Sequence, residues 1–213
     1  MQTLPPLVRR GIMFVLSSPS GAGKSTLARL LLDAERDIKL SISVTTRKRR
    51  QSELEGVHYQ FVGERQFLAM RDRGDLLEWA HVHGNYYGTP RDPVDAAIEE
   101  GGDILFDIDW QGTLQLYENR REDVVSVFVL PPSMAELRSR LERRAEDQPE
   151  VISQRLKNAT EEMNHWNEYD YVLINDDLQA AYEKVHAILT VERLRRQRRT
   201  AISEFVGRLL SET

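Results

Sequence analysis

Four apolar runs along the chain are continuous enough to be buried β-strands. They comprise Met13–Leu16, Ile104–Ile108, Val124–Leu130 and Tyr171–Ile174. Apolar residues follow one another in these runs instead of alternating with polar ones, which is typical of strands that are covered on both faces. The pattern therefore predicts a parallel sheet with helices on both sides.

Helical patterns separate these runs. A capping box at Ser133–Glu136 predicts that a helix begins there and runs toward Arg144. Asp176 and Asp177 open a last long helix, where two acids favour the positive end of the helix dipole. The first run is followed by an apolar stripe at helical spacing, formed by Leu27, Leu30, Leu31 and Ala34. Strands that alternate with helices indicate an open α/β fold.

Two segments interrupt this alternation. From about Ser41 to Thr89 the chain carries short strand-like alternations and stretches rich in glycine and aromatic residues, which predict a small mixed lobe. The segment Arg138–Arg155 is dense in arginine and acids and poor in apolar residues. We expect this second segment to be exposed and mobile.

Composition narrows the class of protein. The chain has 213 residues, of which 40% are hydrophobic, enough for one sizeable core. The net charge of -5 argues against a nucleic-acid-binding protein. The absence of cysteine excludes disulfides, thiolate metal sites and cysteine nucleophiles. Because no stretch approaches the roughly 20 apolar residues of a membrane span, we expect a soluble, cytoplasmic protein without membrane contact.

The stretch that follows the first strand almost matches a phosphate-binding loop. Gly23, Lys24 and Ser25 fit the end of the pattern G-x-x-x-x-G-K-[ST], whereas Ser18 replaces the first glycine. Backbone N–H groups of such a loop and the dipole of the following helix bind phosphate, the lysine reaches the outer phosphates, and the hydroxyl binds Mg²⁺. We expect the cradle to tolerate Ser18, because serine fits wherever φ stays negative.

Several further motifs follow in order. They are Ser41–Arg50 with Glu53, Gly56 and Tyr59; Glu78–Ala80; Gly84–Thr89; Asp107–Gly112; and Asn175–Asp177. From about residue 12 to residue 190, this succession resembles the guanylate kinases, which convert GMP and ATP to GDP and ADP. The resemblance implies a P-loop NTPase-type parallel sheet flanked by helices, with an inserted mixed α/β GMP-binding lobe and a small helical lid. The implied core is 1–42, 90–137 and 156–213, the lobe 43–89 and the lid 138–155.

The resemblance also implies the roles of individual residues. Those expected in catalysis are Lys24, Arg50, Arg144 and Arg155. Those expected to bind ATP are Ser18, Pro19, Ser20, Gly21, Ala22, Gly23, Lys24, Ser25, Thr26, Arg140 and Asn175. Those expected to bind GMP are Ser43, Arg47, Arg50, Glu53, Tyr59, Glu78, Tyr87, Thr89 and Asp107. Mg²⁺, which accompanies ATP, is expected at Ser25 with Asp107 or Asp109; one of these acids could instead brace the loop.

The residue types suit these roles. Arginine forks and tyrosine hydroxyls hold a phosphate. The carboxylate of Glu78 can accept two parallel hydrogen bonds from guanine N1–H and N2–H₂, a donor pair that adenine lacks, and the Thr89 hydroxyl can donate to guanine O6. Arg140, Arg144 and Arg155 can spread the charge of the transferring phosphoryl group. Guanylate kinase lids commonly read Arg-Gly, whereas Arg143–Asp147 departs here, so Arg143 and Arg144 both remain candidates.

Each of these features also has a less specific interpretation. The basic run at residues 45–50 could be a targeting or nucleic-acid patch, Glu78 an exposed strand-end acid, and the arginine cluster of the lid a solvated helix face. His81 and His83 are two residues apart but too few for a zinc site. The basic stretch Glu192–Arg199 is expected to be a solvated or self-associating tail, with a nucleic-acid or membrane contact as the alternative. Homo-oligomers are compatible with the sequence.

Two rival functions remain. One is a guanylate-kinase-like scaffold that binds peptides and does not catalyse. Such domains typically lose the phosphate loop, which is retained here at Lys24 and Ser25. The other is a kinase for a different nucleoside monophosphate, which Glu78 with Thr89 disfavours. The sequence therefore favours an ATP:GMP phosphotransferase that also accepts dGMP.

Overall fold

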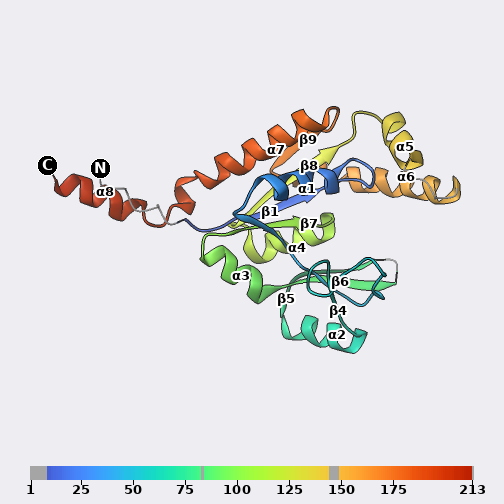
Figure 1. Cartoon of the computed structure of the whole chain (residues 1–213), viewed down its shortest axis with the longest axis horizontal. Coiled ribbons are helices and arrows are strands. Elements are labelled where there is room, and N and C mark those ends of the chain that lie inside the picture. Colours follow the sequence, from blue (N-terminus) through green and yellow to red (C-terminus); the bar gives the residue numbers. More distant parts are fainter. Residues whose placement is uncertain (1–8, 83, 144–148, 213) are drawn as a thin grey trace.

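A parallel sheet forms the centre of the molecule (Figure 1). The computed structural model describes residues 9–82, 84–143 and 149–212. Within these residues the sheet has five strands in the order β2-β7-β1-β8-β9, and every neighbouring pair is parallel. Their bounds are β1 Met13–Ser17, β2 Ile38–Leu40, β7 Asp103–Asp107, β8 Val124–Leu130 and β9 Tyr171–Ile174. The predicted α/β fold with a parallel sheet is confirmed.

The central strand β1 is buried on both faces, as its continuous apolar run predicts. Phe14 and Leu16 belong to one core cluster, which packs against α1 (Lys24–Ala34) and α7 (Leu178–Arg193). Met13 and Val15 belong to the opposite cluster, together with residues of α3 (Arg91–Glu99) and α4 (Trp110–Arg120). Burial on both faces stabilises this strand. It therefore fixes the position of the loop that follows its carboxyl end.

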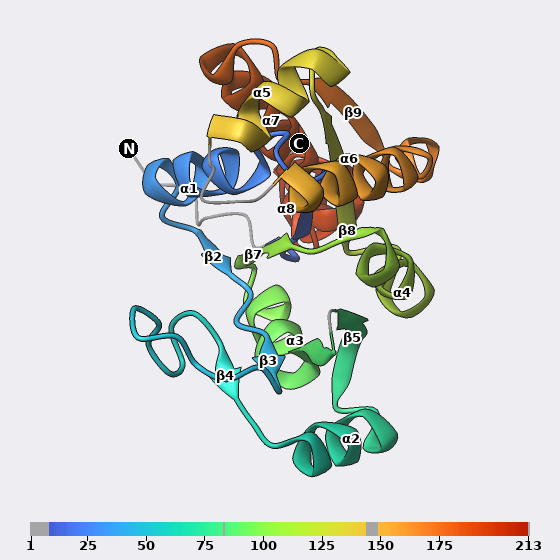
Figure 2. The same cartoon turned by 90° about the vertical axis from the view of Figure 1, so that its right-hand side faces the viewer.

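A second sheet lies to one side of the core, at the bottom of Figure 2. In the described part of the chain it has four strands in the order β4-β3-β6-β5. Their bounds are β3 Val44–Thr45, β4 Gln60–Phe61, β5 Leu76–Val82 and β6 Asn85–Pro90, and α2 spans Glu64–Arg73. Phe67 of α2 packs on Val44 and Leu76 in a small core of its own. The predicted mixed α/β character of this region is thus present.

Helices α5 (Met134–Arg143) and α6 (Pro149–Met163) pack against each other beside the phosphate loop. The Ser133 hydroxyl accepts from the Glu136 N–H at 3.1 Å, as the capping box predicts, but the Glu136 carboxylate binds Arg140. The expectation of an exposed segment is wrong for Leu141 and Ile152, which are buried between the helices. Arg144 lies outside the described residues.

The C-terminal region differs most from the sequence-based expectation. Helix α7 begins at its Asp177 cap, as predicted, and ends at Arg193, but it is not the last helix, since α8 spans Ile202–Ser211. Arg193 is half-buried and Arg198 is buried, so neither is a fully solvated side chain. Arg193 pairs with Glu35 and Asp103, and Arg198 is 4% exposed with Nη1 donating to the Gly11 carbonyl. The buried Asp103, the half-buried Glu35 and a backbone carbonyl therefore bind these two guanidinium groups, whereas Arg195 and Arg196 of the same stretch are exposed, as expected.

No helix in the described residues is both long and apolar enough to cross a membrane.

Candidate active site

The loop between β1 and α1 forms a tight turn at the carboxyl end of the central strand. Its left-handed backbone falls on Gly21 (φ 93°) and Gly23 (φ 104°), which glycine adopts at no steric cost. The Ser18 hydroxyl, in place of the first glycine, donates to the Pro19 carbonyl at 3.0 Å. The loop then leads into the N-terminus of α1 at Lys24, where helix N–H groups and the dipole favour an anion.

Asp107 is placed beside the loop because β7 neighbours β1 in the sheet. Its Oδ1 lies 2.6 Å from Lys24 Nζ, and its Oδ2 accepts from the Ser25 hydroxyl at 3.3 Å. Lys24 Nζ also donates to the Ile108 carbonyl at 3.2 Å. Asp109 instead caps the N-terminus of α4, where its Oδ1 accepts from the Gly112 N–H at 3.1 Å. Strand β7 ends at Asp107, so Ile108 and Asp109 lie beyond it.

A pocket of about 260 Å³ lies along this loop. Its lining consists of Ser18, Pro19, Ser20, Gly21, Gly23, Lys24, Ser25, Asp107, Asp109 and Glu162. Glu162 belongs to α6, and one of its carboxylate oxygens accepts from the Ser20 N–H at 3.1 Å. This acid had no signal in the sequence, because 142 positions separate it from Ser20.

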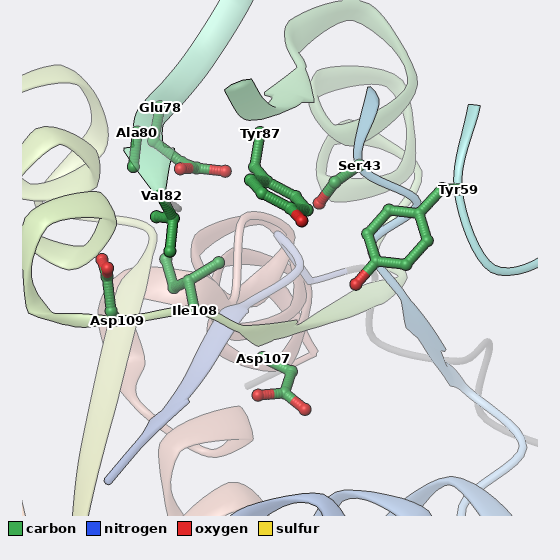
Figure 3. A pocket seen from close by; sticks show the side chains of 9 residues that line it. All are labelled: Ser43, Tyr59, Glu78, Ala80, Val82, Tyr87, Asp107, Ile108 and Asp109. Atoms are coloured by element: carbon green, nitrogen blue, oxygen red, sulfur yellow. The ribbon is translucent and has the colours of Figure 1, made fainter. Parts of the chain in front are cut away.

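Glu78 is buried in a second pocket, of about 200 Å³ (Figure 3). The side chain comes from β5, is 4% exposed, and accepts from the Thr89 hydroxyl of β6 at 2.6 Å. The Ser43 and Thr89 hydroxyls lie 3.5 Å apart. The pKa of Glu78 is raised to about 7, mainly by burial and also by Asp109, whereas the Thr89 hydrogen bonds oppose the shift. Glu78 is therefore a buried carboxyl group and not an exposed strand-end acid.

The remaining walls of this pocket bring aromatic, apolar and acidic side chains together. Its lining consists of Ser43, Tyr59, Glu78, Ala80, Val82, Tyr87, Asp107, Ile108 and Asp109. Figure 3 shows Glu78 at one end and Tyr59, from beyond β3, at the other. The Tyr59 and Tyr87 rings meet edge to face, with centroids 6.1 Å apart.

The guanidinium group of Arg47 lies next to Tyr59. Arg47 pairs with Glu53 through two hydrogen bonds, of 2.6 and 3.1 Å, and lies 5.4 Å from the Tyr59 ring centroid. Glu53 also accepts from the Arg50 N–H at 2.8 Å. The Arg47 hydrogen bond and the Arg50 N–H together lower the pKa of Glu53 to about 2. The Arg50 side chain is exposed and does not line the pocket.

Arg140 and Asn175 hold the other side of the phosphate loop. The Asn175 amide donates to the Ala22 carbonyl at 2.7 Å, and Arg140 donates to the carbonyls of Ala22 and Asn175 at 3.3 and 3.0 Å. A Cβ at Gly23 would lie 2.3 Å from Asn175 Nδ2, so the loop and Asn175 are in close contact. The pocket here, of about 400 Å³, is lined by Gly21, Gly23, Thr26, Glu136, Arg140, Arg143, Asn175, Asp176, Asp177 and Leu178.

A model of the guanylate kinase family matches residues 10–192. The chain belongs to the guanylate kinase family.

Curated relatives and a solved structure agree with this assignment. A guanylate kinase of Agrobacterium fabrum (strain C58) is 61% identical over 97% of this chain and 94% of its own. The guanylate kinase of Rhizobium meliloti (strain 1021) is 62% identical with the same coverage of each chain. The crystal structure of guanylate kinase from Anaplasma phagocytophilum superposes with a TM-score of 0.77 at 39% identity, covering 94% of this chain and 95% of that one.

The structure brings most of the residues expected from the guanylate kinase resemblance to two adjoining pockets. The loop residues and Asp107 lie in one, and Ser43, Tyr59, Glu78, Tyr87 and Asp107 in the other. Arg155 is half-buried on α6 and lines none of the three pockets described. Sequence reasoning missed Glu162, and it also missed Gly112, whose added Cβ would lie 2.9 Å from Glu78 Oε2. Gly112 does belong to the Asp107–Gly112 motif, which was the available signal.

Proposed function

We propose that this guanylate kinase family member is an ATP:GMP phosphotransferase that reversibly gives GDP and ADP and also accepts dGMP. One observation carries the proposal: Asp107 and Asp109 line both the phosphate-loop pocket and the Glu78 pocket, so the two pockets adjoin. Phosphoryl transfer between nucleotides needs two anionic substrates held side by side with their reacting groups aligned. The names of the relatives support the same activity.

Guanine selection is assigned to Glu78. A buried carboxylate that already accepts from Thr89 needs further donors, and guanine offers N1–H and N2–H₂ side by side. Adenine has no such pair, so it would leave a buried acid poorly paired, and this is a strong basis for rejection. Thr89 can turn its hydroxyl toward guanine O6, and Ser43 lies within reach of Thr89.

The acceptor phosphate is assigned to Arg47, Arg50, Tyr59 and Tyr87. Glu53 holds the Arg47 fork and the Arg50 backbone, so that both are positioned before the substrate arrives. In this proposal the exposed Arg50 side chain turns inward when the lobe closes on GMP. Arginine forks bind phosphate oxygens bidentately, and tyrosine hydroxyls add neutral donors.

The donor set at the loop fits Mg²⁺. The Ser25 hydroxyl and the Asp107 carboxylate, 3.3 Å apart, supply the oxygen ligands that Mg²⁺ prefers. No group of three or more metal-binding side chains occurs among the described residues, which suits an ion that takes most of its ligands from phosphate and water. Asp107 is the better candidate, because Asp109 already caps α4. When bound, Mg²⁺ neutralises charge on the transferring phosphates.

The chain's own residues then align and stabilise the reacting groups. Lys24 places a positive charge at the outer phosphates of ATP, once they displace Asp107 from it. The acceptor phosphate is already a nucleophilic anion, so no general base is required. We assign stabilisation of the transferring group to Arg140, Arg144 and Arg155 of the lid (138–155), which closes over the core (1–42, 90–137, 156–213) while the lobe (43–89) closes on GMP.

A non-catalytic scaffold function is not favoured, because Lys24, Ser25 and Asp107 converge on one site. The proposal further includes a cytoplasmic location, small-molecule substrates rather than nucleic acid or membrane, and a homo-oligomer as one admissible assembly.

An acceptor panel tests the proposed activity. ADP release from MgATP would be measured by a coupled assay with GMP, dGMP, AMP, CMP or UMP as acceptor. We expect turnover with GMP and dGMP alone, and none for Lys24→Ala, which should still bind GMP in calorimetry. Turnover with AMP would overturn the guanine assignment. Absence of turnover with every acceptor, in folded protein that binds GMP, would support the scaffold function instead.

A further inference from the structure

A carboxylate contacts the part of the molecule that is built to bind phosphate. Glu162 Oε2 accepts from the Ser20 N–H at 3.1 Å, and Glu162 lines the same pocket as Lys24 and Ser25. Backbone N–H groups of a phosphate-binding loop receive the anionic oxygens of a nucleotide. An oxygen of Glu162 thus contacts the loop in the way that a phosphate oxygen would.

Among the groups around Glu162, those that favour its charged form belong to the phosphate loop. Burial raises the pKa of Glu162 most, Asp109 and Glu161 raise it further, and the Ser20 N–H and Lys24 lower it. The groups that favour the charged form are therefore the two that would hold a nucleotide. The remaining carboxylates nearby act against it.

The position of Glu162 on its helix is also unfavourable for an acid. Helix α6 ends at Met163 and has no basic residue in its last turn. An acid there faces the negative end of the helix dipole. The contact with the phosphate loop compensates for this placement. Because α6 packs against α5 through Leu156 and Ala159, the carboxylate links the loop to the whole helical pair.

We infer that Glu162 is an internal anion of the ATP site, which occupies the phosphate loop in the nucleotide-free enzyme and competes with the nucleotide phosphates. Entry of a nucleotide then breaks the contact between Glu162 and Ser20 and frees the end of α6 from the loop. The carboxylate holds the cradle before the nucleotide enters and weakens nucleotide binding through like-charge repulsion. This inference rests on the proposed use of the loop for ATP.

Glu162→Gln removes the charge and keeps an acceptor oxygen for the Ser20 N–H. We expect the variant to bind ADP about three- to tenfold more tightly in calorimetry, since a like charge near the phosphates is lost. The KM for ATP should fall by a similar factor, and the KM for GMP should stay within about twofold, since Glu162 does not line the Glu78 pocket. A purely structural role would not separate the two substrates in this way.

Glu161→Gln is the matched control. It removes the same charge from the adjacent, exposed position, which does not line the pocket, and ADP affinity should not change. Equal tightening in both variants would show a general charge effect and overturn the inference. So would unchanged or weaker ADP binding in Glu162→Gln.

ADP would be titrated with and without Mg²⁺. Tightening in both titrations supports competition with phosphate, whereas weakening confined to the magnesium titration would assign Glu162 to the metal instead. If Glu162→Gln does not fold, Glu162→Asp retracts the carboxylate by one methylene and should also tighten ADP binding. Because ADP affinity is measured directly, these results do not depend on which acceptor the enzyme uses.

Discussion

The buried carboxyl of Glu78 shows how one residue can serve recognition only in one protonation state. Its oxygen accepts from Thr89, its pocket also holds hydroxyls, apolar side chains and the acid Asp109, and burial is the largest cause that raises its pKa to about 7. The carboxylate accepts hydrogen bonds with both oxygens, whereas the protonated acid turns one oxygen into a donor. Guanine presents two donors, so GMP binding selects the carboxylate.

GMP binding by this residue should therefore depend on pH near neutrality. As pH falls through the pKa of about 7, the free enzyme becomes protonated at Glu78, and the KM for GMP should rise. Between pH 8.5 and pH 6.5 the expected rise is about fourfold, from the fraction of carboxylate alone. The measurement is the KM for GMP at saturating MgATP across this range.

Glu78→Gln serves as the control, because it carries no titrating group at this position and should bind GMP weakly at every pH. The GMP phosphate also titrates near this range, with a pKa of about 6, and Glu78→Gln reports that contribution by itself. An identical pH profile in both proteins would show that Glu78 does not titrate in the binding step.

At the residue scale the sequence revealed groups that belong to local motifs and missed those that meet only in the fold. Glu78, Thr89 and Asp107 stand in short motifs whose residue types suit their chemistry, and the structure places them at the two pockets. Their roles stay predictions. Glu162 stands in no motif, since its partner Ser20 is brought near only by the packing of α6 on the loop. Tertiary contacts of this kind leave no trace in a single sequence.

At the scale of elements, helix α4 joins the core to the small sheet. Strand β5 is an edge strand of that sheet, and Gln115 of α4 covers its open side: the Gln115 amide accepts from the Trp79 N–H at 3.0 Å and donates to the Trp79 carbonyl at 2.7 Å. Asn119 adds a bond to the Leu77 carbonyl at 3.1 Å. Edge strands are normally protected, and here the protecting helix also supports the pocket.

Gly112 allows α4 to lie this close to β5. A Cβ at Gly112 would sit 2.9 Å from Glu78 Oε2 and 3.2 Å from Ile108 Cδ1. Gly112→Ala should therefore displace the Glu78 carboxylate or shift the helix away from β5. We expect the KM for GMP to rise about tenfold, a loss of about 1.4 kcal/mol of binding, with the KM for ATP unchanged.

Steady-state kinetics with each substrate varied in turn would measure the KM for GMP and the KM for ATP separately. Gly207→Ala in α8 is a matched control, because a Cβ there meets nothing within 4 Å. Equal effects on both substrates would indicate general misfolding, and no effect at all would show that the contact at Gly112 is easily relieved.

Elements were predicted where the burial pattern is simple. Strands β1 and β8 follow from continuous apolar runs that are buried on both faces, whereas the equally apolar run of the edge strand β9 leaves Val172 and Ile174 exposed. Strand β2 was missed because it has three residues, of which Lys39 and Leu40 are exposed, so no apolar run announces it. Helices α5 and α6 bury Leu141 and Ile152 against each other, and a charged composition concealed that small core.

At the scale of the whole molecule, one end of the sheet carries the candidate active site and the opposite end carries ion pairs that stabilise the fold. Strand β7 ends at Asp107, in the candidate active site, and begins at Asp103, at the opposite end. The Asp103 side chain is fully buried and accepts from Arg9, from Arg193 and from the Ile12 N–H at 2.9 Å. One carboxylate therefore ties the N-terminal segment, the central sheet and the end of α7 together.

Loss of Asp103 should destabilise the fold without altering the site. Asp103→Ala leaves two half-buried guanidinium groups and a buried N–H without this acceptor, and the expected loss is about 3 kcal/mol in the free energy of unfolding, because breaking a buried ion pair strands its partners. Urea unfolding would measure it. Asp72→Ala, which removes an exposed acid paired with Arg71, should change stability by less than about 0.5 kcal/mol. The KM values of folded Asp103→Ala should match the wild type, since Asp103 lies at the far end of β7 from Asp107; a loss below 1 kcal/mol, or altered KM values, would contradict this division between the two ends.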